Sequence, residues 1–424
     1  MRFSLVLLVA FAAAAAANEE ILPSLRGMQA IRIMADTEEK LNLVKSYEGV
    51  PGFDFIKLTA NLQEPVNVLV TAEQATFFKS VLERNEIDYN VYVNNVLEKV
   101  EEEKIAMELA RNLPPLEKFA GRSFTFTSFP RYNVIVSYLQ DIVKSYSNVA
   151  TLLDIGTSYE GRTIYAIKIS SGSNNPAILI DAGIHAREWA APVTSLYVIN
   201  ELVENPDLYA NVDWYIIPTL NPDGYEYTFT TYRLWRKTRS VTAGSTCLGV
   251  DGNRNFELQW MLTGASSSPC SDTYAGKAPF SEVETQALRN FVLANKDSIK
   301  LYLTYHSYGN YILYPWGYTS DLPDDEPELR SLAEAADDAI ASLYGTRYTI
   351  GSSTNVLYAA AGGSDDWVKG IGGVELSYTI ELPGGGWFGF DLPASRIIPV
   401  GAETFESIKV FGKYIAQKFG STRN

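Results

Sequence analysis

The chain has only two histidines, His185 and His306, and each follows a short apolar segment with the pattern of a strand. Glu188 comes three residues after His185, close enough for an imidazole nitrogen and a carboxylate oxygen to meet one cation. Two imidazoles and one carboxylate leave the fourth position of a tetrahedral zinc ion open, as in catalytic zinc sites. The alternative for each residue is an ordinary hydrogen-bonded side chain at a strand end. The pattern therefore predicts a zinc site of the open, catalytic kind.

Strand-like and helical segments alternate from residue 123 to residue 424 without a second linker. Segments 177–181 and 300–305 are strand-like and lead to the two histidines; 164–170 and 214–218 are also strand-like, and 192–202 and 281–295 are helical. Such alternation predicts an α/β fold in which a mixed, largely parallel sheet carries helices on both faces. Both histidines would then lie at the carboxyl edge of the sheet, where α/β proteins bind their ligands.

Residues 29–108 follow another pattern, in which period-two and helical spacings alternate as β-α-β-β-α-β. This order predicts a small ferredoxin-like α+β unit ahead of the α/β domain. Asp36 with Glu39, and Thr71 with Gln74, have the spacing of capping pairs that would begin its two helices.

A segment rich in Glu and Lys, residues 97–111, predicts a connecting helix whose charged side chains face solvent. Residues 112–122 then contain two adjacent prolines among basic residues, which is typical of a hinge. Arg111, Lys118 and Arg122 are candidate cleavage points there for an activating trypsin-like protease.

The chain begins Met1-Arg2-Phe3 and continues as an apolar, alanine-rich run through Ala17. This is the pattern of a secretory signal peptide, and the run is shorter than the roughly 20 residues of a membrane-spanning helix. We therefore expect a secreted, extracellular protein. A disulfide between Cys247 and Cys270 is expected in turn, because the extracellular compartment is oxidising.

Charge balance and cysteine content exclude several classes of function. Acidic residues outnumber basic ones by 50 to 35, for a formal net charge of −15, whereas a nucleic-acid binder needs a basic face. Two cysteines are too few for a tetra-cysteine zinc site or an iron–sulfur cluster. We expect no nucleic-acid partner, no membrane partner, and a monomer.

The segments around the histidines resemble the zinc metallocarboxypeptidases of the pancreatic A/B family, in the family's order and at near-family spacings. The matching blocks are His185 to Glu188, Ile217-Pro-Thr-Leu-Asn-Pro-Asp-Gly224, Arg233-Leu-Trp-Arg236-Lys-Thr-Arg239, Gly249-Val-Asp-Gly-Asn253-Arg254-Asn-Phe256, His306-Ser-Tyr308, Tyr358, Gly362-Gly-Ser-Asp-Asp-Trp367 and Glu381. The unit before Arg111 is similar to the family's inhibitory prosegment. The resemblance implies a signal peptide (1–17), an inhibitory prosegment (18–122) and a zinc carboxypeptidase catalytic domain (123–424).

The resemblance assigns one Zn²⁺ per chain to His185, Glu188 and His306. Asp251 matches the family's carboxylate that orients the first histidine, a partner that fixes both tautomer and ring angle.

The resemblance also implies a mechanism for hydrolysis of the C-terminal peptide bond. Glu381 would act as general base on a zinc-bound water that attacks the carbonyl, and Arg236 would polarise that carbonyl. Asn253, Arg254 and Tyr358 match the residues that hold the terminal carboxylate of the substrate, for which the planar fork of arginine is suited.

Arg187 and Tyr308 match further substrate-binding residues. Asp365 stands where the family separates its classes, an apolar residue going with aromatic and aliphatic ends and an aspartate with Lys and Arg; Ser353, opposite it, is small and polar. A buried anion favours an incoming cation. The resemblance thus implies a carboxypeptidase B-like enzyme acting on peptide or protein C-termini. The alternatives are A-type specificity and a non-catalytic secreted zinc-binding protein on the same fold.

Overall fold

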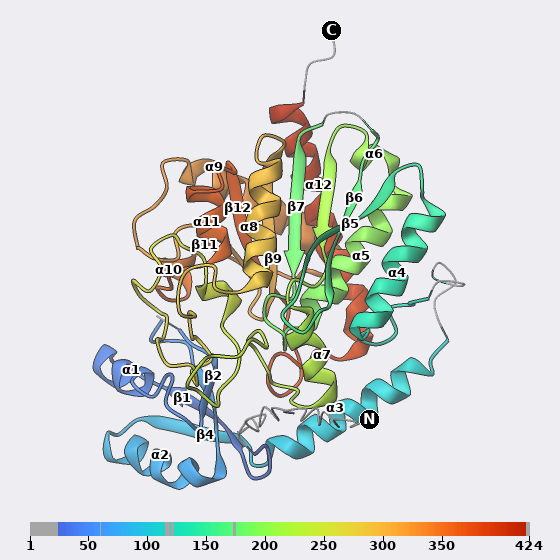
Figure 1. Ribbon diagram of the computed structural model, residues 1–424. Helices are drawn as coiled ribbons and strands as arrows, with labels where there is room; N and C mark the ends of the chain where they lie inside the picture. Colours follow the sequence, from blue (N-terminus) through green and yellow to red (C-terminus); the bar gives the residue numbers. More distant parts are fainter. Residues whose placement is uncertain (1–23, 60, 115–118, 120–122, 173–174, 421–424) are drawn as a thin grey trace, which may run out of the picture.

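The computed structural model describes residues 24–59, 61–114, 119, 123–172 and 175–420. The predicted signal peptide and two candidate cleavage residues, Lys118 and Arg122, lie outside these ranges. Figure 1 shows a smaller unit, drawn in blue, below a larger α/β unit, with one long helix running from the first to the second.

The smaller unit has the predicted β-α-β-β-α-β order, with strands arranged β2-β3-β1-β4 in one antiparallel sheet. Its elements are β1 (Gln29–Met34), α1 (Glu38–Lys45), β2 (Phe53–Lys57), β3 (Val66–Val70), α2 (Ala72–Arg84) and β4 (Asp88–Val93). The two helices pack on one face of the sheet, where Val44, Phe78 and Leu82 meet the alternate apolar residues of the strands. The period-two and helical spacings of apolar residues in the sequence therefore predicted the order of elements in this unit correctly.

The predicted capping pair of Asp36 and Glu39 is wrong by one residue. Helix α1 begins at Glu38, and Thr37 is its cap, because the Thr37 hydroxyl accepts the Lys40 backbone N–H at 3.3 Å. Asp36 instead forms an ion pair with the Lys40 ammonium at 2.9 Å. Thr71 does precede α2 as its cap residue, without a side-chain hydrogen bond.

The larger unit contains, in its described part, an eight-stranded mixed sheet in the order β11-β10-β12-β9-β7-β8-β6-β5. Its strands are β5 (Ala150–Thr157), β6 (Thr163–Ile169), β7 (Ala177–Ala182), β8 (Asp213–Ile217), β9 (Ile299–Ser307), β10 (Tyr311–Tyr314), β11 (Thr349–Ser352) and β12 (Leu376–Leu382). Strands β12, β9, β7 and β8 are parallel neighbours at the centre, and β6 and β5 add antiparallel pairs at one edge. The predicted mixed sheet is confirmed.

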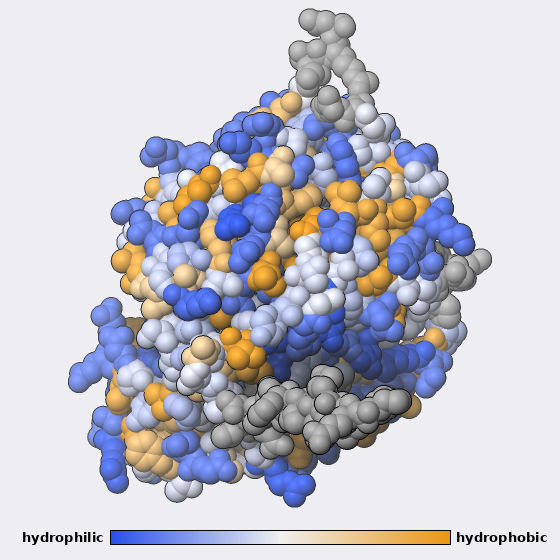
Figure 2. Space-filling view, in the orientation of Figure 1, coloured by the Kyte–Doolittle hydropathy of each residue, from blue (hydrophilic) through white to orange (hydrophobic). Residues whose placement is uncertain are grey.

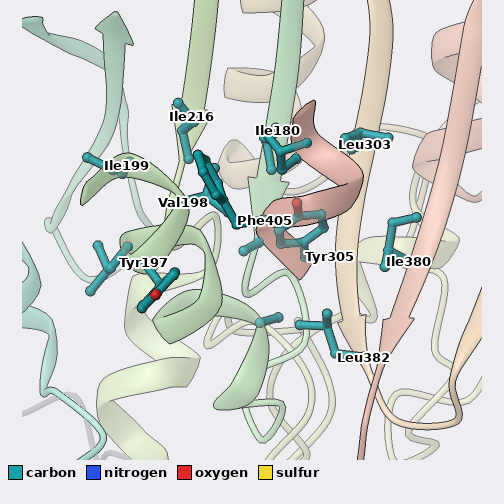
Figure 3. Close-up of a cluster of buried hydrophobic side chains, with 14 of the residues drawn as sticks. Ile180, Tyr197, Val198, Ile199, Ile216, Leu303, Tyr305, Ile380, Leu382 and Phe405 are labelled. Carbon is teal, nitrogen blue, oxygen red and sulfur yellow. The ribbon is translucent and has the colours of Figure 1, made fainter. Parts of the chain in front are cut away.

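Helices cover both faces of this sheet, as predicted (Figure 1). They are α4 (Tyr132–Ser145), α5 (Ala190–Glu204), α6 (Pro206–Tyr209), α7 (Pro222–Thr230), α8 (Val283–Asn295), α9 (Glu326–Tyr344), α10 (Ser353–Val356), α11 (Ser364–Gly370) and α12 (Ile397–Phe419), with short 3-10 turns η2 (Gly252–Arg254) and η3 (Ala394–Arg396). The apolar layer beneath α5 and α12 is drawn in Figure 3, where Ile180, Leu303 and Ile380 of three central strands meet Phe405 and Val198. No helix among the described residues is both long and apolar enough to cross a bilayer.

The connecting helix, α3 (Val96–Arg111), is not simply a solvated element. Glu103 on α3 bonds Arg233 of the larger unit through two contacts of 2.7 and 2.8 Å, and the Arg233 guanidinium lies over the Trp189 ring at 3.6 Å. One residue of the charged segment that was predicted to face solvent, Glu103, therefore contacts the larger unit instead. Figure 2 shows a hollowed, largely hydrophilic surface where α3 passes beside α7.

Candidate active site

The predicted metal ligands meet at the carboxyl edge of the sheet. His185 Nδ1 lies 2.8 Å from Glu188 Oε1, and His306 Nδ1 lies 3.1 Å from both Glu188 Oε2 and His185 Nδ1. One ligand atom from each residue falls within 4.8 Å of the others, and all three side chains are buried. Parallel pairing of β7 with β9 brings the two histidines together although they are far apart in the sequence.

The turn that carries His185 away from β7 depends on Gly183. Its φ is +69°, and a Cβ there would lie 3.1 Å from Pro192 Cγ and 3.4 Å from Thr219 Cα. A side chain would therefore be strained by both conformation and space. Pro192 belongs to α5, so glycine lets the ligand loop pack directly on the helix that follows it.

The electrostatics of the three ligands suit a cation. Burial alone would raise the pKa of Glu188, but His185 and His306 outweigh it and hold that pKa well below its usual range. Burial would lower the pKa of His306, whereas Glu188, Glu381 and Asp181 raise it to about 9. The cluster thus stabilises positive charge, and its two imidazoles and one carboxylate are a donor set that zinc accepts with one position open. The residues present fit the zinc ion.

Asp251 connects the first histidine to Arg236. Its Oδ1 lies 3.1 Å from His185 Nε2, and its Oδ2 accepts from Arg236 Nη2 at 2.8 Å and Nε at 3.1 Å. Burial would raise the pKa of Asp251, but Arg236 and His185 hold it well below the usual range. The carboxylate is therefore ionised, and it fixes both the ring of His185 and the guanidinium, whose Nη1 faces Glu188 at 3.8 Å.

Glu381 lies beside the ligands, on β12. Its Oε2 is buried and has no hydrogen-bond partner among the described residues. Burial raises the pKa of Glu381 to about 8, against the attraction of His306 and Arg236. A carboxylate poised near neutral pH with a free oxygen has the properties of a general base.

Arg254 and Tyr358 lie in contact with each other. Arg254 is buried, with Nη2 3.4 Å from the Tyr358 hydroxyl and Nε donating to the Gly264 carbonyl at 2.7 Å. Asn253 is adjacent and accepts the Ser364 backbone N–H at 2.9 Å. These contacts bring the three predicted carboxylate-binding residues into one group.

Asp365 is buried at the start of α11 with 6% of its surface exposed. Its Oδ2 accepts from the Thr379 hydroxyl at 3.1 Å and from the Ser353 hydroxyl at 3.5 Å. Asp366 is directed elsewhere, since both its oxygens accept the Gly317 backbone N–H at 2.9 Å. Asp365 and Ser353 therefore face each other, as the resemblance implied, and Asp366 supports a turn.

Arg187 and Tyr308 face the smaller unit. Arg187 Nη1 bonds Asp54 Oδ2 of β2 at 2.7 Å and lies 3.5 Å from Asp272 Oδ2. The Tyr308 ring packs edge-on against Phe390 at 5.2 Å, and it also packs against an apolar cluster that includes strand residues of the smaller unit. These two predicted substrate-binding residues therefore lie where the smaller unit meets the larger one.

A cavity of about 210 Å³ separates the two units, and its walls combine the β2 region with Glu188, Arg236 and Glu381. Two acidic residues of the smaller unit, Glu48 and Asp54, line this cavity, and the sequence analysis predicted a role for neither. Burial, then Asp272, raises the pKa of Asp54 to about 7, while Arg187 lowers it. Burial raises the pKa of Glu48, with Arg254 and Arg236 opposing the rise. Their sequence positions carry no signal, because docking between units leaves no periodicity within either one.

Comparison with known proteins agrees with this geometry. Residues 135–407 match the family model described as zinc carboxypeptidase, and residues 31–103 match the carboxypeptidase activation peptide. Carboxypeptidase B of Astacus astacus is 52% identical over 300 residues, covering 69% of this chain and 99% of that protein. Carboxypeptidase B of Rattus norvegicus is 38% identical over 425 residues, covering 97% and 99%. The solved structure of carboxypeptidase A from Helicoverpa armigera superposes with a TM-score of 0.87 at 33% identity, covering 94% of this chain and 99% of that one.

One family model spans more than half of the chain, a second matches most of the smaller unit and the first half of α3, and the zinc-type ligand set is assembled at the sheet edge. The chain therefore belongs to the zinc carboxypeptidase family, and it is a metallocarboxypeptidase zymogen with its activation peptide attached.

Proposed function

We propose that this protein is a secreted monomeric zymogen which, once a trypsin-like protease cuts the linker after α3, releases C-terminal Lys or Arg from peptides and proteins. The observation that carries the basic preference is the buried carboxylate of Asp365. Thr379 and Ser353 give it two hydroxyl contacts, and no Lys or Arg of the described residues forms an ion pair with it. A buried anion of this kind gains most from a cationic substrate side chain.

Substrate binding begins with the terminal carboxylate. The guanidinium of Arg254, with Tyr358 and Asn253 beside it, offers donors for a planar anion at the cleft wall. Only a chain end supplies that anion, so the group restricts hydrolysis to the last peptide bond. A basic side chain bound this way would point toward Asp365.

The residues around the scissile bond have separate tasks. His185, Glu188 and His306 would hold the zinc ion, which would supply Lewis-acid polarisation of a carbonyl and a lowered pKa for water. Glu381 takes the proton from the attacking water and returns it to the leaving amine. Arg236, fixed by Asp251, presents permanent positive charge where oxyanion character develops.

The activation peptide keeps the uncut chain inactive by covering these groups. Asp54 bonds Arg187, and the β2 region closes the cleft above Glu188 and Glu381. We propose residues 18–122 as the part removed, with Arg122, Lys118 or Arg111 as the cleaved residue. The alternative is A-type specificity, and the relatives above include proteins named carboxypeptidase A as well as carboxypeptidase B.

The proposal is tested by release of arginine from a peptide that ends in Arg and from the same peptide with an amidated C-terminus. The trypsin-cut, zinc-loaded protein should release arginine from the free acid only, and the uncut protein should release very little. A cut protein that holds zinc but remains inert would overturn the proposed activity. Equal release from the amide would overturn the role of Arg254.

A further inference from the structure

A buried row of polar residues lies directly beneath the ligands, and two of its members, Asp181 and Thr304, have no part in the proposed hydrolysis. Asp181 on β7 pairs in register with Thr304 on β9, which pairs with Thr379 on β12. All three are at most 6% exposed. Because side chains two residues apart on a strand share a face, Thr304 lies below His306 and Thr379 lies below Glu381.

Thr304 touches the zinc ligand. Its hydroxyl oxygen is 3.2 Å from His306 Nε2, whereas His306 Nδ1 faces Glu188 and His185. A cation among these three residues takes Nδ1, so the hydrogen of the neutral ring must be on Nε2. Nε2–H then donates to the Thr304 hydroxyl, whose own hydrogen needs a different acceptor.

Asp181, which pairs with Thr304 across β7 and β9, is the candidate acceptor. Its Oδ1 already receives the Tyr302 hydroxyl at 2.5 Å, and its Oδ2 is buried without a hydrogen-bond partner among the described residues. Burial raises the pKa of Asp181 to about 6, and the hydroxyls of Tyr302 and Thr304 oppose that rise. A carboxylate with one unpartnered oxygen therefore stands at the strand position paired with Thr304, whose hydroxyl hydrogen needs an acceptor.

We propose that Thr304 is a positioning residue for the zinc ligand His306, bridging the imidazole Nε2–H to the carboxylate of Asp181. The two histidines are then supported differently. His185 Nε2 meets the carboxylate of Asp251 directly at 3.1 Å, and His306 reaches its carboxylate through a hydroxyl. Groups of this kind fix the tautomer and ring orientation of a metal ligand.

The test measures zinc affinity by chelator competition on the full-length protein, for Thr304→Val and for the hydroxyl-retaining Thr304→Ser. Thr304→Val should bind zinc about 10- to 100-fold more weakly than the native protein, and Thr304→Ser should stay close to native. Thr379→Val is the matched control, because it is the same change in the same buried row but on a residue that contacts Asp365. Equal affinities for Thr304→Val and native protein, or equal losses in Thr304→Val and Thr379→Val, would overturn the bridge.

Asp181→Asn tests the carboxylate end of the bridge. It also replaces Thr304→Val as the test variant if Thr304→Val does not fold. It should weaken zinc binding in the same direction, and the ligand-field spectrum of its cobalt form should shift together with the affinity. Native zinc affinity in Asp181→Asn would overturn the role of Asp181. The inference rests on the zinc site of the proposed enzyme. The two failures can be told apart. If only the Thr304 bridge is wrong, the native protein still binds zinc and hydrolyses substrate; if the proposed function is wrong, the native protein itself does not.

Discussion

His306 and Glu381 occupy paired positions on the adjacent parallel strands β9 and β12. The register places a predicted zinc ligand and the predicted general base side by side at one edge of the sheet, both on the face that carries α8 and α11. Neither position depends on a flexible loop. The distance between ligand and base is therefore set by backbone hydrogen bonds of the central sheet.

Glu381→Gln should lower kcat of the cut protein by about 10²- to 10⁴-fold, because the amide cannot accept the proton from water. Zinc content should stay at one ion per chain, since Glu381 is not among the ligands. Kinetics and metal analysis on the same sample check both statements. Activity within a few-fold of native would show that another group serves as the base.

His306→Ala should remove zinc and activity together, because the remaining His185 and Glu188 offer only two ligands. Metal analysis after dialysis against a weak chelator is the measurement, with circular dichroism to confirm folding. His185→Ala should behave in the same way, since the chain has no third histidine that could replace the lost ligand. Zinc-dependent activity retained in either variant would contradict the ligand set.

Glu103→Gln should loosen the activation peptide from the catalytic domain. It leaves the buried Arg233 guanidinium without its carboxylate, and removing one partner of a buried ion pair costs about 3–5 kcal/mol. Activity of the uncut protein on a small substrate should rise about 10-fold or more. The control is Glu101→Gln, two residues away, which is exposed, has no ion-pair partner among the described residues and should change nothing. Equal activities of the two uncut variants would rule out α3 as a clamp.

Glu284→Gln should change how stability depends on pH. Burial raises the pKa of the Glu284 carboxyl to about 7, above the value of 4.5 for an unperturbed glutamate. The native state therefore favours the protonated form, so its contribution to stability is present below pH 4.5 and lost as pH rises through about 7. At pH 8 the glutamine variant should be more stable by roughly 2–3 kcal/mol, and at pH 5 much of that gain should vanish.

Urea unfolding at several pH values measures this difference. The Tyr159 backbone N–H that donates to Glu284 at 3.0 Å keeps an acceptor in the glutamine side chain. Glu334→Gln, at an exposed position on α9, is the control and should follow the native profile. Parallel curves for Glu284→Gln and native protein would contradict the assigned shift.

The central sheet and the ligands were predictable because their signals are local. Segments 177–181 and 300–305 are apolar runs, and histidines that follow parallel strands meet at one edge. The proposed role of Asp365 in specificity came from the family resemblance, and the structure adds the Thr379 and Ser353 contacts around it. Those partners lie on separate elements, which spacing along the chain does not reveal.

The contacts between units were not predictable in the same way. Asp54 on β2 and Glu103 on α3 look like ordinary exposed charges in a strand and a charged helix, yet each bonds a buried arginine of the other unit. Thr304 looks like any β-branched strand residue, and its pairing with Asp181 follows only from the register of β7 and β9. Asp36 and Thr37 are both residue types that favour a helix N-cap, and in the structure Thr37 is the N-cap of α1.

The proposed basic preference is measured by comparing kcat/KM of the cut, zinc-loaded protein on two peptides that differ only in ending with Lys or Phe. Asp365→Asn serves as the matched variant, because it removes the charge and keeps the shape. The native enzyme should favour Lys by about 10²-fold or more, because a bound Phe leaves a buried carboxylate unpaired, and Asp365→Asn should lose most of this ratio. A native enzyme that cleaves the Phe peptide as well as the Lys peptide, or an unchanged ratio in Asp365→Asn, would contradict the proposed preference.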